Sequence, residues 1–190
     1  PNMGRRVLLG VSGSIAAYKA AVLARDLMKA GWSVQAVLTE GAKQFVQPLT
    51  FSALTGRDAL TEWVDDDGKI QHVEQAHDVD LLLIAPASAN LIARLASGMA
   101  DDLLTAIALS TQAPIMMAPA METGMYNHAA TQDNLQKLRD RGVMVLEPEE
   151  GALASGRSGT GRMREPADIC SSVQRVFEDC PWKGRRVVVT

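Results

Sequence analysis

The chain has few cysteines, few aromatic residues and no long hydrophobic run, and each shortage excludes a class of protein. Its two cysteines, Cys170 and Cys180, are too few for a disulfide framework, and nothing around them is typical of a metal site. No apolar run approaches the roughly 18 residues that a membrane-spanning helix needs. The chain also lacks the basic and apolar segments of a secretory signal. We therefore expect a cytoplasmic protein with no bound metal and no membrane partner.

Basic residues do not outnumber acidic ones. The formal net charge is −3, from 19 lysines and arginines against 22 aspartates and glutamates, so we expect no nucleic-acid partner. Hydrophobic residues make up 47% of the 190 residues, which is ordinary for a globular protein. The length and composition fit one large domain with a core of its own.

The segment from Val7 to Lys19 has the pattern of a strand, a turn and a helix. The apolar run Val7-Leu-Leu-Gly-Val11 is typical of a buried parallel strand. It is followed by Ser12-Gly13-Ser14 and then by apolar residues at helical spacing. In α/β proteins such a turn lets backbone N–H groups and a helix N-terminus bind a phosphate. The turn alone leaves two interpretations open: a phosphate site, or a tight connection without a ligand.

The rest of the chain alternates between apolar strands and helical segments. This order predicts an α/β fold with one doubly wound, mostly parallel sheet of the Rossmann-like or flavodoxin-like kind, with helices on both faces. We expect an edge strand at 59–63, and a loop without secondary structure at 147–164 that closes over a substrate or is simply a surface loop. The other strands are predicted at 7–11, 33–38, 80–85, 114–118 and 143–146, and the main helices at 15–30, 91–98, 101–109, 131–141 and 166–178.

The last residues repeat the pattern with which the first strand begins. Gly184-Arg-Arg-Val-Val-Val-Thr190 is similar to Gly4-Arg-Arg-Val-Leu-Leu-Gly10, and it follows a Pro-Trp-Lys linker. We therefore expect one domain at 1–180, and at 181–190 a linker and the beginning of the first strand of a second domain.

Two motifs that follow predicted strands carry a resemblance to a known family. Pro86-Ala-Ser-Ala-Asn90 and Pro119-Ala-Met-Glu-Thr-Gly-Met125 resemble the homo-oligomeric flavin-containing Cys decarboxylase family. The segments 10–19, His72-Val-Glu and 161–166 are similar, in order and spacing, to its phosphopantothenoylcysteine decarboxylase branch. The tail looks like the start of the phosphopantothenate–cysteine ligase domain that is fused to this branch in bacteria.

The resemblance implies a function and a cofactor. The expected reaction is the FMN-dependent decarboxylation of 4′-phospho-N-pantothenoylcysteine to 4′-phosphopantetheine in coenzyme A biosynthesis. The expected assembly is a homo-oligomer built on trimers, such as a dodecamer, with a ligase domain fused to each chain. By position, FMN would be held by Gly13, Ser14, Ile15, Ala16, Thr39, Ser88, Ala89, Asn90, Leu91 and Ala118, and the substrate by Ala120, Met121 and Met125.

The resemblance also implies catalytic positions. In the family mechanism the flavin takes a hydride from the carbon that bears the thiol, CO2 leaves, and the enethiolate is then protonated and reduced. His72 occupies the position of the family's base. Glu122 stands where the family has Asn, and Ser155 where this branch has a Cys proton donor. An ionised Glu122 would repel the substrate carboxylate by on the order of 4 kcal/mol at about 4 Å, and a hydroxyl is a weaker acid than a thiol.

These two departures leave alternatives to the full reaction. One is an FMN-binding oligomeric scaffold or regulatory homologue with weak or no decarboxylase activity. Another is decarboxylation of a different thiol, such as a C-terminal cysteine of a peptide, against which the ligase-like tail argues.

Overall fold

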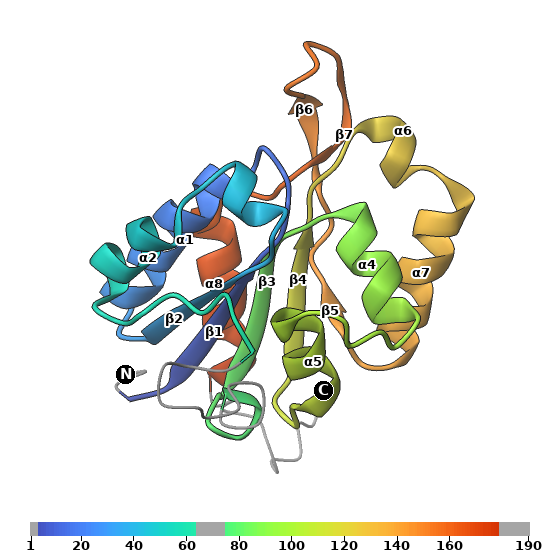
Figure 1. Cartoon of the computed structure of the whole chain (residues 1–190). Coiled ribbons are helices and arrows are strands. Elements are labelled where there is room, and N and C mark those ends of the chain that lie inside the picture. The colour runs from blue at the N-terminus through green and yellow to red at the C-terminus, as the bar shows by residue number, and fades with distance from the viewer. Residues whose placement is uncertain (1–3, 64–74, 179–190) are drawn as a thin grey trace, which may run out of the picture.

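A five-stranded parallel sheet forms the centre of the molecule, as the computed structural model in Figure 1 shows. The structure describes residues 4–63 and 75–178. The strand order is β2-β1-β3-β4-β5, which is the flavodoxin-like order and confirms the predicted fold class. The strands are β1 (Arg6–Val11), β2 (Ser33–Leu38), β3 (Leu81–Ala87), β4 (Ile115–Pro119) and β5 (Met144–Val145).

Helices cover both faces of the sheet because successive strand residues point to opposite sides. Leu9 packs with one group of helices and Leu8 with the other, so each face has its own hydrophobic core. The first face is covered by α1 (Ala17–Lys29), α2 (Pro48–Thr55) and α8 (Pro166–Phe177), and the second by α4 (Ala89–Ala96), α5 (Leu103–Ser110) and α7 (Ala129–Asp140) (Figure 1).

The strand order reverses between β1 and β3, and open α/β sheets bind ligands at such a point. One buried hydroxyl joins the two strand ends there. Ser12 Oγ donates a hydrogen bond to the carbonyl of Pro86 at 2.7 Å and accepts one from the N–H of Ser88 at 2.8 Å. The sheet therefore fixes the turn after β1 relative to the turn after β3.

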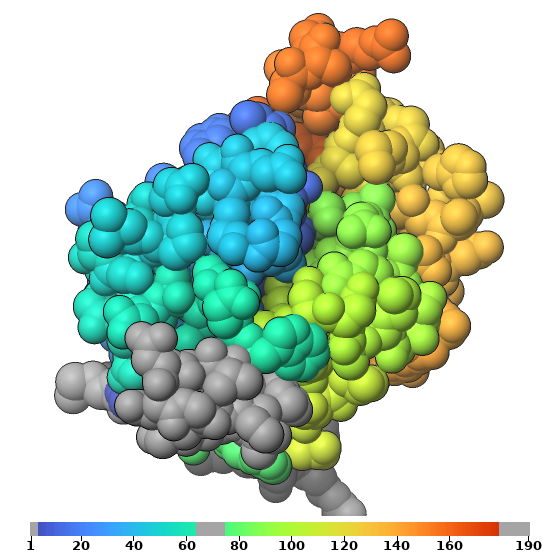
Figure 2. All heavy atoms as spheres, viewed as in Figure 1, coloured from blue at the N-terminus to red at the C-terminus, as the bar shows by residue number. Residues whose placement is uncertain are grey.

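The predicted loop at 147–164 is wrong, because most of it forms an antiparallel hairpin. Its strands are β6 (Glu149–Ala152) and β7 (Ser158–Arg162). Strand signals depend on alternating apolar and polar residues, and this segment has glycines and serines instead. The hairpin is not part of the central sheet, and it stands out from the body above the short helix α6 (Thr123–Tyr126) (Figures 1 and 2).

Two smaller predictions are also wrong. The predicted edge strand at 59–63 is reduced to a single bridge between Leu60 and Val37. The helix predicted to begin at Asp101 begins at Leu103, because Asp102 is its N-cap and accepts a hydrogen bond from the N–H of Thr105 at 2.8 Å.

Three expectations lie outside the described residues. These are the proposed base His72, the position of Cys180, and the linker and strand at 181–190. Within the described ranges, none of the helices is long and apolar enough to cross a membrane.

Candidate functional site

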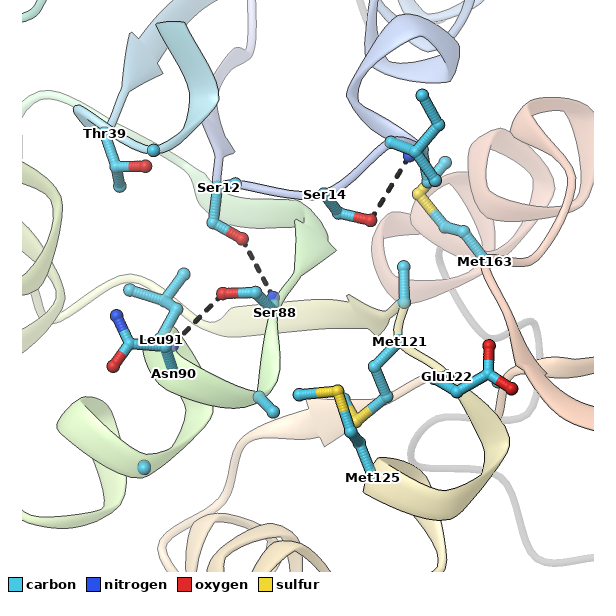
Figure 3. A pocket seen from close by; sticks show the side chains of 18 of the residues that line it. Ser12, Ser14, Thr39, Ser88, Asn90, Leu91, Met121, Glu122, Met125 and Met163 are labelled. Atoms are coloured by element: carbon cyan, nitrogen blue, oxygen red, sulfur yellow. Dashed lines mark hydrogen bonds between the residues drawn. The ribbon is translucent and has the colours of Figure 1, made fainter. Parts of the chain in front are cut away.

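An open pocket of about 1270 Å³ lies at the carboxyl ends of the central strands. A single small-molecule site usually measures about 300–1,000 Å³, so this pocket has room for two ligands side by side. In Figure 3, Thr39, Ser12 and Ser88 lie toward one end of it, and Met121, Glu122 and Met125 toward the other. The two ends are built from different parts of the chain.

The first end is formed by the turn between β1 and α1. Within the part of the chain that the structure describes, no group accepts a hydrogen bond from the backbone N–H of Gly13, Ser14 or Ile15. The side chain of Ser14 instead turns back and accepts from the N–H of Ala16 at 3.2 Å (Figure 3). Three free N–H groups at the N-terminus of a 13-residue helix fit an anionic group such as a phosphate.

Two glycines bring the walls of this end together. A Cβ atom added to Gly13 would lie 3.0 Å from the carbonyl carbon of Gly41, in the segment after β2. Neighbouring Thr39 is buried, and its hydroxyl accepts a hydrogen bond from the N–H of Ala42 at 3.2 Å. The close approach of the two backbones holds the turn after β1 against the turn after β2.

A second helix N-terminus opens into the same pocket. Ser88 caps α4 by accepting a hydrogen bond from the N–H of Leu91 at 3.2 Å (Figure 3). The N–H groups of Ala89 and Asn90 have no acceptor among the described residues. Two helix termini and several small side chains therefore offer an anion-binding end with room for a large flat group.

The other end is formed by α6 and the hairpin. Glu122 is half-buried and precedes α6, and Ser155 lies in the exposed turn between β6 and β7. Ser155 Oγ donates a hydrogen bond to Glu122 Oε2 at 3.0 Å. The two positions that depart from the family pattern are therefore in direct contact, although 33 residues separate them.

Tyr126, the last residue of α6, anchors this short helix to the segment after β5. The Tyr126 hydroxyl donates a hydrogen bond to Glu147 Oε2 at 2.5 Å, and Glu147 also pairs with Arg139 at 2.5 Å. Burial, and after it the hydrogen bond to Glu147, raises the pKa of Tyr126, so the hydroxyl stays a donor. Met125 and Glu122 are held by this anchored helix rather than by a free loop.

The pocket also has charged side chains, most of which are paired. Arg94 of α4 forms ion pairs with Asp101 and with Asp102, the latter at 2.8 Å. Burial alone would lower the pKa of Arg94, but its hydrogen bonds to the two aspartates raise it on balance. The same contact lowers the pKa of Asp101, mainly through its hydrogen bond from Arg94.

A second cluster of charged side chains connects the cofactor end of the pocket with the hairpin end. Lys19 of α1 is buried, and its Nζ lies 2.9 Å from Glu165 Oε1. Arg162, the last residue of β7, pairs with the same carboxylate oxygen. The hydrogen bond from Lys19 is the main cause that lowers the pKa of Glu165. This network ties the base of the hairpin to the first helix.

Most of the predicted site residues lie together in this pocket. Ala118 does not line it, because it is fully buried in β4, and Ser155 reaches it only through Glu122. His72 lies outside the described residues. The predicted residues that line the pocket are Gly13, Ser14, Ile15, Ala16, Thr39, Ser88, Ala89, Asn90, Leu91, Ala120, Met121, Glu122 and Met125.

Sequence reasoning missed several residues of the site. Ser12 lies inside the recognised turn, but nothing in the sequence distinguishes its buried hydroxyl from that of Ser14. Lys19 and Arg94 follow the two helix N-termini by about one turn, a position that is usually solvated for a charged residue. Met163 lines the pocket from the segment after β7, where no periodic pattern predicted a contact.

Comparison with known proteins identifies the family to which the chain belongs. The model of the family described as Flavoprotein matches residues 1–178. The coenzyme A biosynthesis bifunctional protein CoaBC of Vibrio cholerae serotype O1 is 45% identical over 189 residues, which are 98% of this chain and 47% of the relative. The chain thus spans about half the length of the curated relatives that it matches.

Two solved structures are similar over nearly their whole length. One is a cysteine-to-serine mutant of PPC decarboxylase complexed with pantothenoylaminoethenethiol, 34% identical, with a TM-score of 0.84, covering 92% of this chain and 99% of that one. The other is the FMN-dependent cysteine decarboxylase SpaF, 31% identical, with a TM-score of 0.80, covering 92% and 98%. Because the family model matches residues 1–178 of its 190, this chain belongs to the Flavoprotein family.

Proposed function

We propose that this domain binds FMN and uses it to decarboxylate 4′-phospho-N-pantothenoylcysteine to 4′-phosphopantetheine, a step of coenzyme A biosynthesis. The observation that carries the proposal is the pocket itself. Just before helix α1, at one end, the backbone N–H groups of Gly13, Ser14 and Ile15 have no acceptor among the described residues, and the hydrogen-bonded pair of Glu122 and Ser155 lies at the other end. The names of the bifunctional relative and of the PPC decarboxylase structure support the choice of reaction.

The anion-binding end would hold the cofactor. The N–H groups of Gly13, Ser14 and Ile15 would bind the phosphate, with Ala16 beside them. When bound, FMN would supply a reversible acceptor for one hydride. The predicted remainder of the cofactor site is Thr39, Ser88, Ala89, Asn90, Leu91 and Ala118, of which Ala118 would act only through the backbone of β4.

The hairpin end would hold the substrate. Ala120, Met121 and Met125 present an apolar wall on which the chain of the substrate can lie. His72 remains the proposed base for the substrate thiol, on the strength of the resemblance. Glu122 would face the substrate carboxylate, and Ser155 of the hairpin would hold Glu122 in place there.

We also propose that the domain assembles into a homo-oligomer. Ile15, Tyr18 and Val22 are 56%, 60% and 49% exposed; Tyr18 and Val22 lie one turn apart on the same face of α1, and Ile15 lies in the turn just before this helix. Ile15 and Tyr18 also line the pocket, so a second copy seated on this stripe would help to enclose the cofactor. A trimer-based assembly is the form that we expect.

We also propose that a ligase domain is fused to this one. The bifunctional relative and the repeated Gly-Arg-Arg-Val pattern at 184–187 support a fused ligase domain, which would supply the substrate of this one. We expect this domain to work in the cytoplasm, as the sequence predicts.

The test is to mix the purified protein, loaded with FMN, with phosphopantothenoylcysteine under anaerobic conditions. We expect transient loss of the oxidised flavin absorbance, release of CO2 and formation of phosphopantetheine. The matched control is the serine analogue of the substrate, which has no thiol and should leave the flavin oxidised. Flavin binding without any bleaching by the cysteine substrate would contradict the proposal and favour the scaffold interpretation.

A further inference from the structure

Among the carboxylates that line the described part of the pocket, Glu122 alone has no cationic partner. Glu40 pairs with Lys43 at 2.5 Å, and both Asp101 and Asp102 pair with Arg94. A neighbouring cation holds a carboxylate in its charged form. Glu122 has instead a neutral partner, the hydroxyl of Ser155, at 3.0 Å. It is therefore the carboxyl lining the described part of the pocket that no ion pair holds, and its side-chain partner there is a hydroxyl.

We propose that Glu122, held in place by Ser155, delivers the proton that saturates the carbon from which CO2 has left. This inference rests on the proposed function and deepens it, because it assigns the final step to residues of this chain. Glu122 would be the catalytic acid, since it lines the pocket where the proposed function places the substrate carboxylate. Ser155 would be a positioning residue that acts through Glu122.

The charge of the substrate explains how the proton would be loaded. A substrate carboxylate that approaches Glu122 disfavours two adjacent negative charges, so binding favours the protonated form of Glu122. Protonated Glu122 can then donate a hydrogen bond to that carboxylate, which removes the repulsion expected from the sequence. Glu122 is only half-buried, and Ser155 is exposed, so the proton can come from solvent.

Protonation of the enethiolate by Glu122 leaves every bond and electron accounted for. Loss of CO2 leaves an enethiolate, which is two electrons more oxidised than the final thiol. The C=C electron pair forms a new C–H bond with the proton of Glu122, while the sulfur lone pair forms a C=S bond. The C=S carbon would then take up the hydride that FMN, when bound, would return, and the sulfur would become a thiolate. Glu122 is left ionised beside a site that has lost its negative carboxylate, and it regains a proton from water.

The decisive test compares product identity in the FMN-loaded protein and in Glu122→Gln. The wild-type protein should release phosphopantetheine. Glu122→Gln keeps the size and can still accept from Ser155, but it carries no acidic proton. We expect the ratio of thiol to enethiol product, read by mass spectrometry, to fall by at least about a hundredfold, as for other lost general acids. The control is Glu150→Gln, an exposed glutamate of β6 that does not line the pocket.

Ser155 is tested by a conservative series. Ser155→Ala should lower the same ratio by roughly fivefold, since it removes a hydrogen bond that contributes about 1 kcal/mol to the position of the acid. Ser155→Thr keeps the hydroxyl and should restore the ratio. A purely structural role would instead change flavin retention or KM, with the product ratio unchanged in both variants.

A binding measurement gives a result that does not depend on turnover. Calorimetric titration of the FMN-loaded protein with the serine analogue, in two buffers of different ionisation enthalpy, reports the protons taken up. We expect proton uptake in the wild-type protein and in Glu150→Gln, and its loss in Glu122→Gln.

The outcomes separate the two proposals. If the wild-type protein releases no CO2, the proposed function fails and this inference falls with it. If the wild-type protein makes phosphopantetheine and Glu122→Gln makes it in the same ratio to enethiol, the function stands and the inference is overturned. An enethiol product from the wild-type protein would overturn the inference as well.

Discussion

The two ends of the pocket differ in the material from which they are built. The cofactor end consists mainly of backbone, and the buried hydroxyl of Ser12 joins two central strands there. The hairpin end consists of side chains on α6 and on a two-stranded element that projects from the body (Figure 2), and its contact between Ser155 and Glu122 is exposed. An isolated two-stranded hairpin is marginal in stability without packing partners. The first end is therefore rigid, and the second depends on a few contacts.

This difference bears on Glu122 and Ser155, the two positions that depart from the resemblance. The predicted cofactor residues at 13–16 and 88–91 include backbone donors at strand ends, which cannot move without disturbing the sheet. Glu122 and Ser155 both differ, and they lie on the end where side chains do the chemistry. A change there can be matched by a change in its contact partner while the fold remains intact. The comparison predicts separate effects for substitutions at the two ends.

The largest effect is expected from Gly13→Val at the cofactor end. A Cβ atom at this position would meet the backbone of Gly41 at 3.0–3.1 Å, and backbone cannot yield as a flexible side chain can. The N–H groups of the turn would lose their alignment, and each hydrogen bond to a charged group contributes about 1.5–3 kcal/mol. We expect flavin affinity to fall at least about a hundredfold, measured by fluorescence titration of the cofactor-free protein.

Gly124→Ala is the control for this substitution. Gly124 lies in α6, where an added Cβ atom has nothing within 4 Å. If Gly13→Val binds flavin as tightly as Gly124→Ala does, the turn after β1 does not hold the cofactor.

The next effect is expected from Gly161→Ala at the hairpin end. Gly161 has a φ of +144°, and an added Cβ atom would lie 2.2 Å from the carbonyl oxygen of Met121. The N–H of Met121 donates to the carbonyl of Gly161 at 3.0 Å, so the substitution would separate the base of the hairpin from the substrate wall. We expect turnover to fall by about tenfold or more, because misplacement of about 1 Å is costly in catalysis.

The affinity for flavin should differ between Gly161→Ala and Gly13→Val. Gly161→Ala should keep the affinity within about twofold of the wild-type value, since no backbone donor of the cofactor end is touched. A loss of flavin as large as that of Gly13→Val would show that the two ends are not independent.

A smaller effect is expected from Ser12→Ala. The hydroxyl is buried, and its removal leaves the carbonyl of Pro86 and the N–H of Ser88 each short of one hydrogen bond. A buried polar group without a partner costs about 1–3 kcal/mol. We expect the free energy of unfolding in urea to fall by that amount. Ser171→Ala, which removes an exposed hydroxyl from α8, should change it by less than about 0.5 kcal/mol.

The sequence predicted the cofactor end better than the hairpin end, for physical reasons. Continuous apolar runs mark the buried strands, and the turn chemistry that follows Val11 and Ala87 marks a ligand site at their carboxyl ends. The hairpin has no such signal, because its strands carry Gly151, Gly159 and Gly161 and bury no alternating apolar face. The contact of Glu122 with Ser155 and that of Lys19 with Glu165 join residues far apart in the chain, and only the fold brings them together.

The smallest effect concerns Lys19, which connects the two ends. Its hydrogen bond lowers the pKa of Glu165, and a carboxyl with a lowered pKa stabilises the folded state above its unfolded value of about 4.3. That stabilisation is lost as the pH falls through the lower folded value. Lys19→Met keeps the buried stem and removes the charge, so the acid-induced loss of stability should be smaller in the variant. At pH 7 the cost should be under about 1 kcal/mol, because Glu165 is partly exposed and keeps Arg162.

The measurement is a series of urea unfolding curves for the cofactor-free protein between pH 7 and pH 3. The curves of the wild-type protein and Lys19→Met should converge as the pH falls below about 4, since protonated Glu165 no longer distinguishes them. Lys29→Met, at an exposed lysine of α1 whose nearest carboxylate oxygen is 3.9 Å away, should instead remain parallel to the wild-type curve. Parallel curves for Lys19→Met would mean that its ion pair with Glu165 contributes nothing to stability, and that other contacts, such as that of Met121 with Gly161 and that of Glu149 with the N–H of Glu165, hold the hairpin to the body.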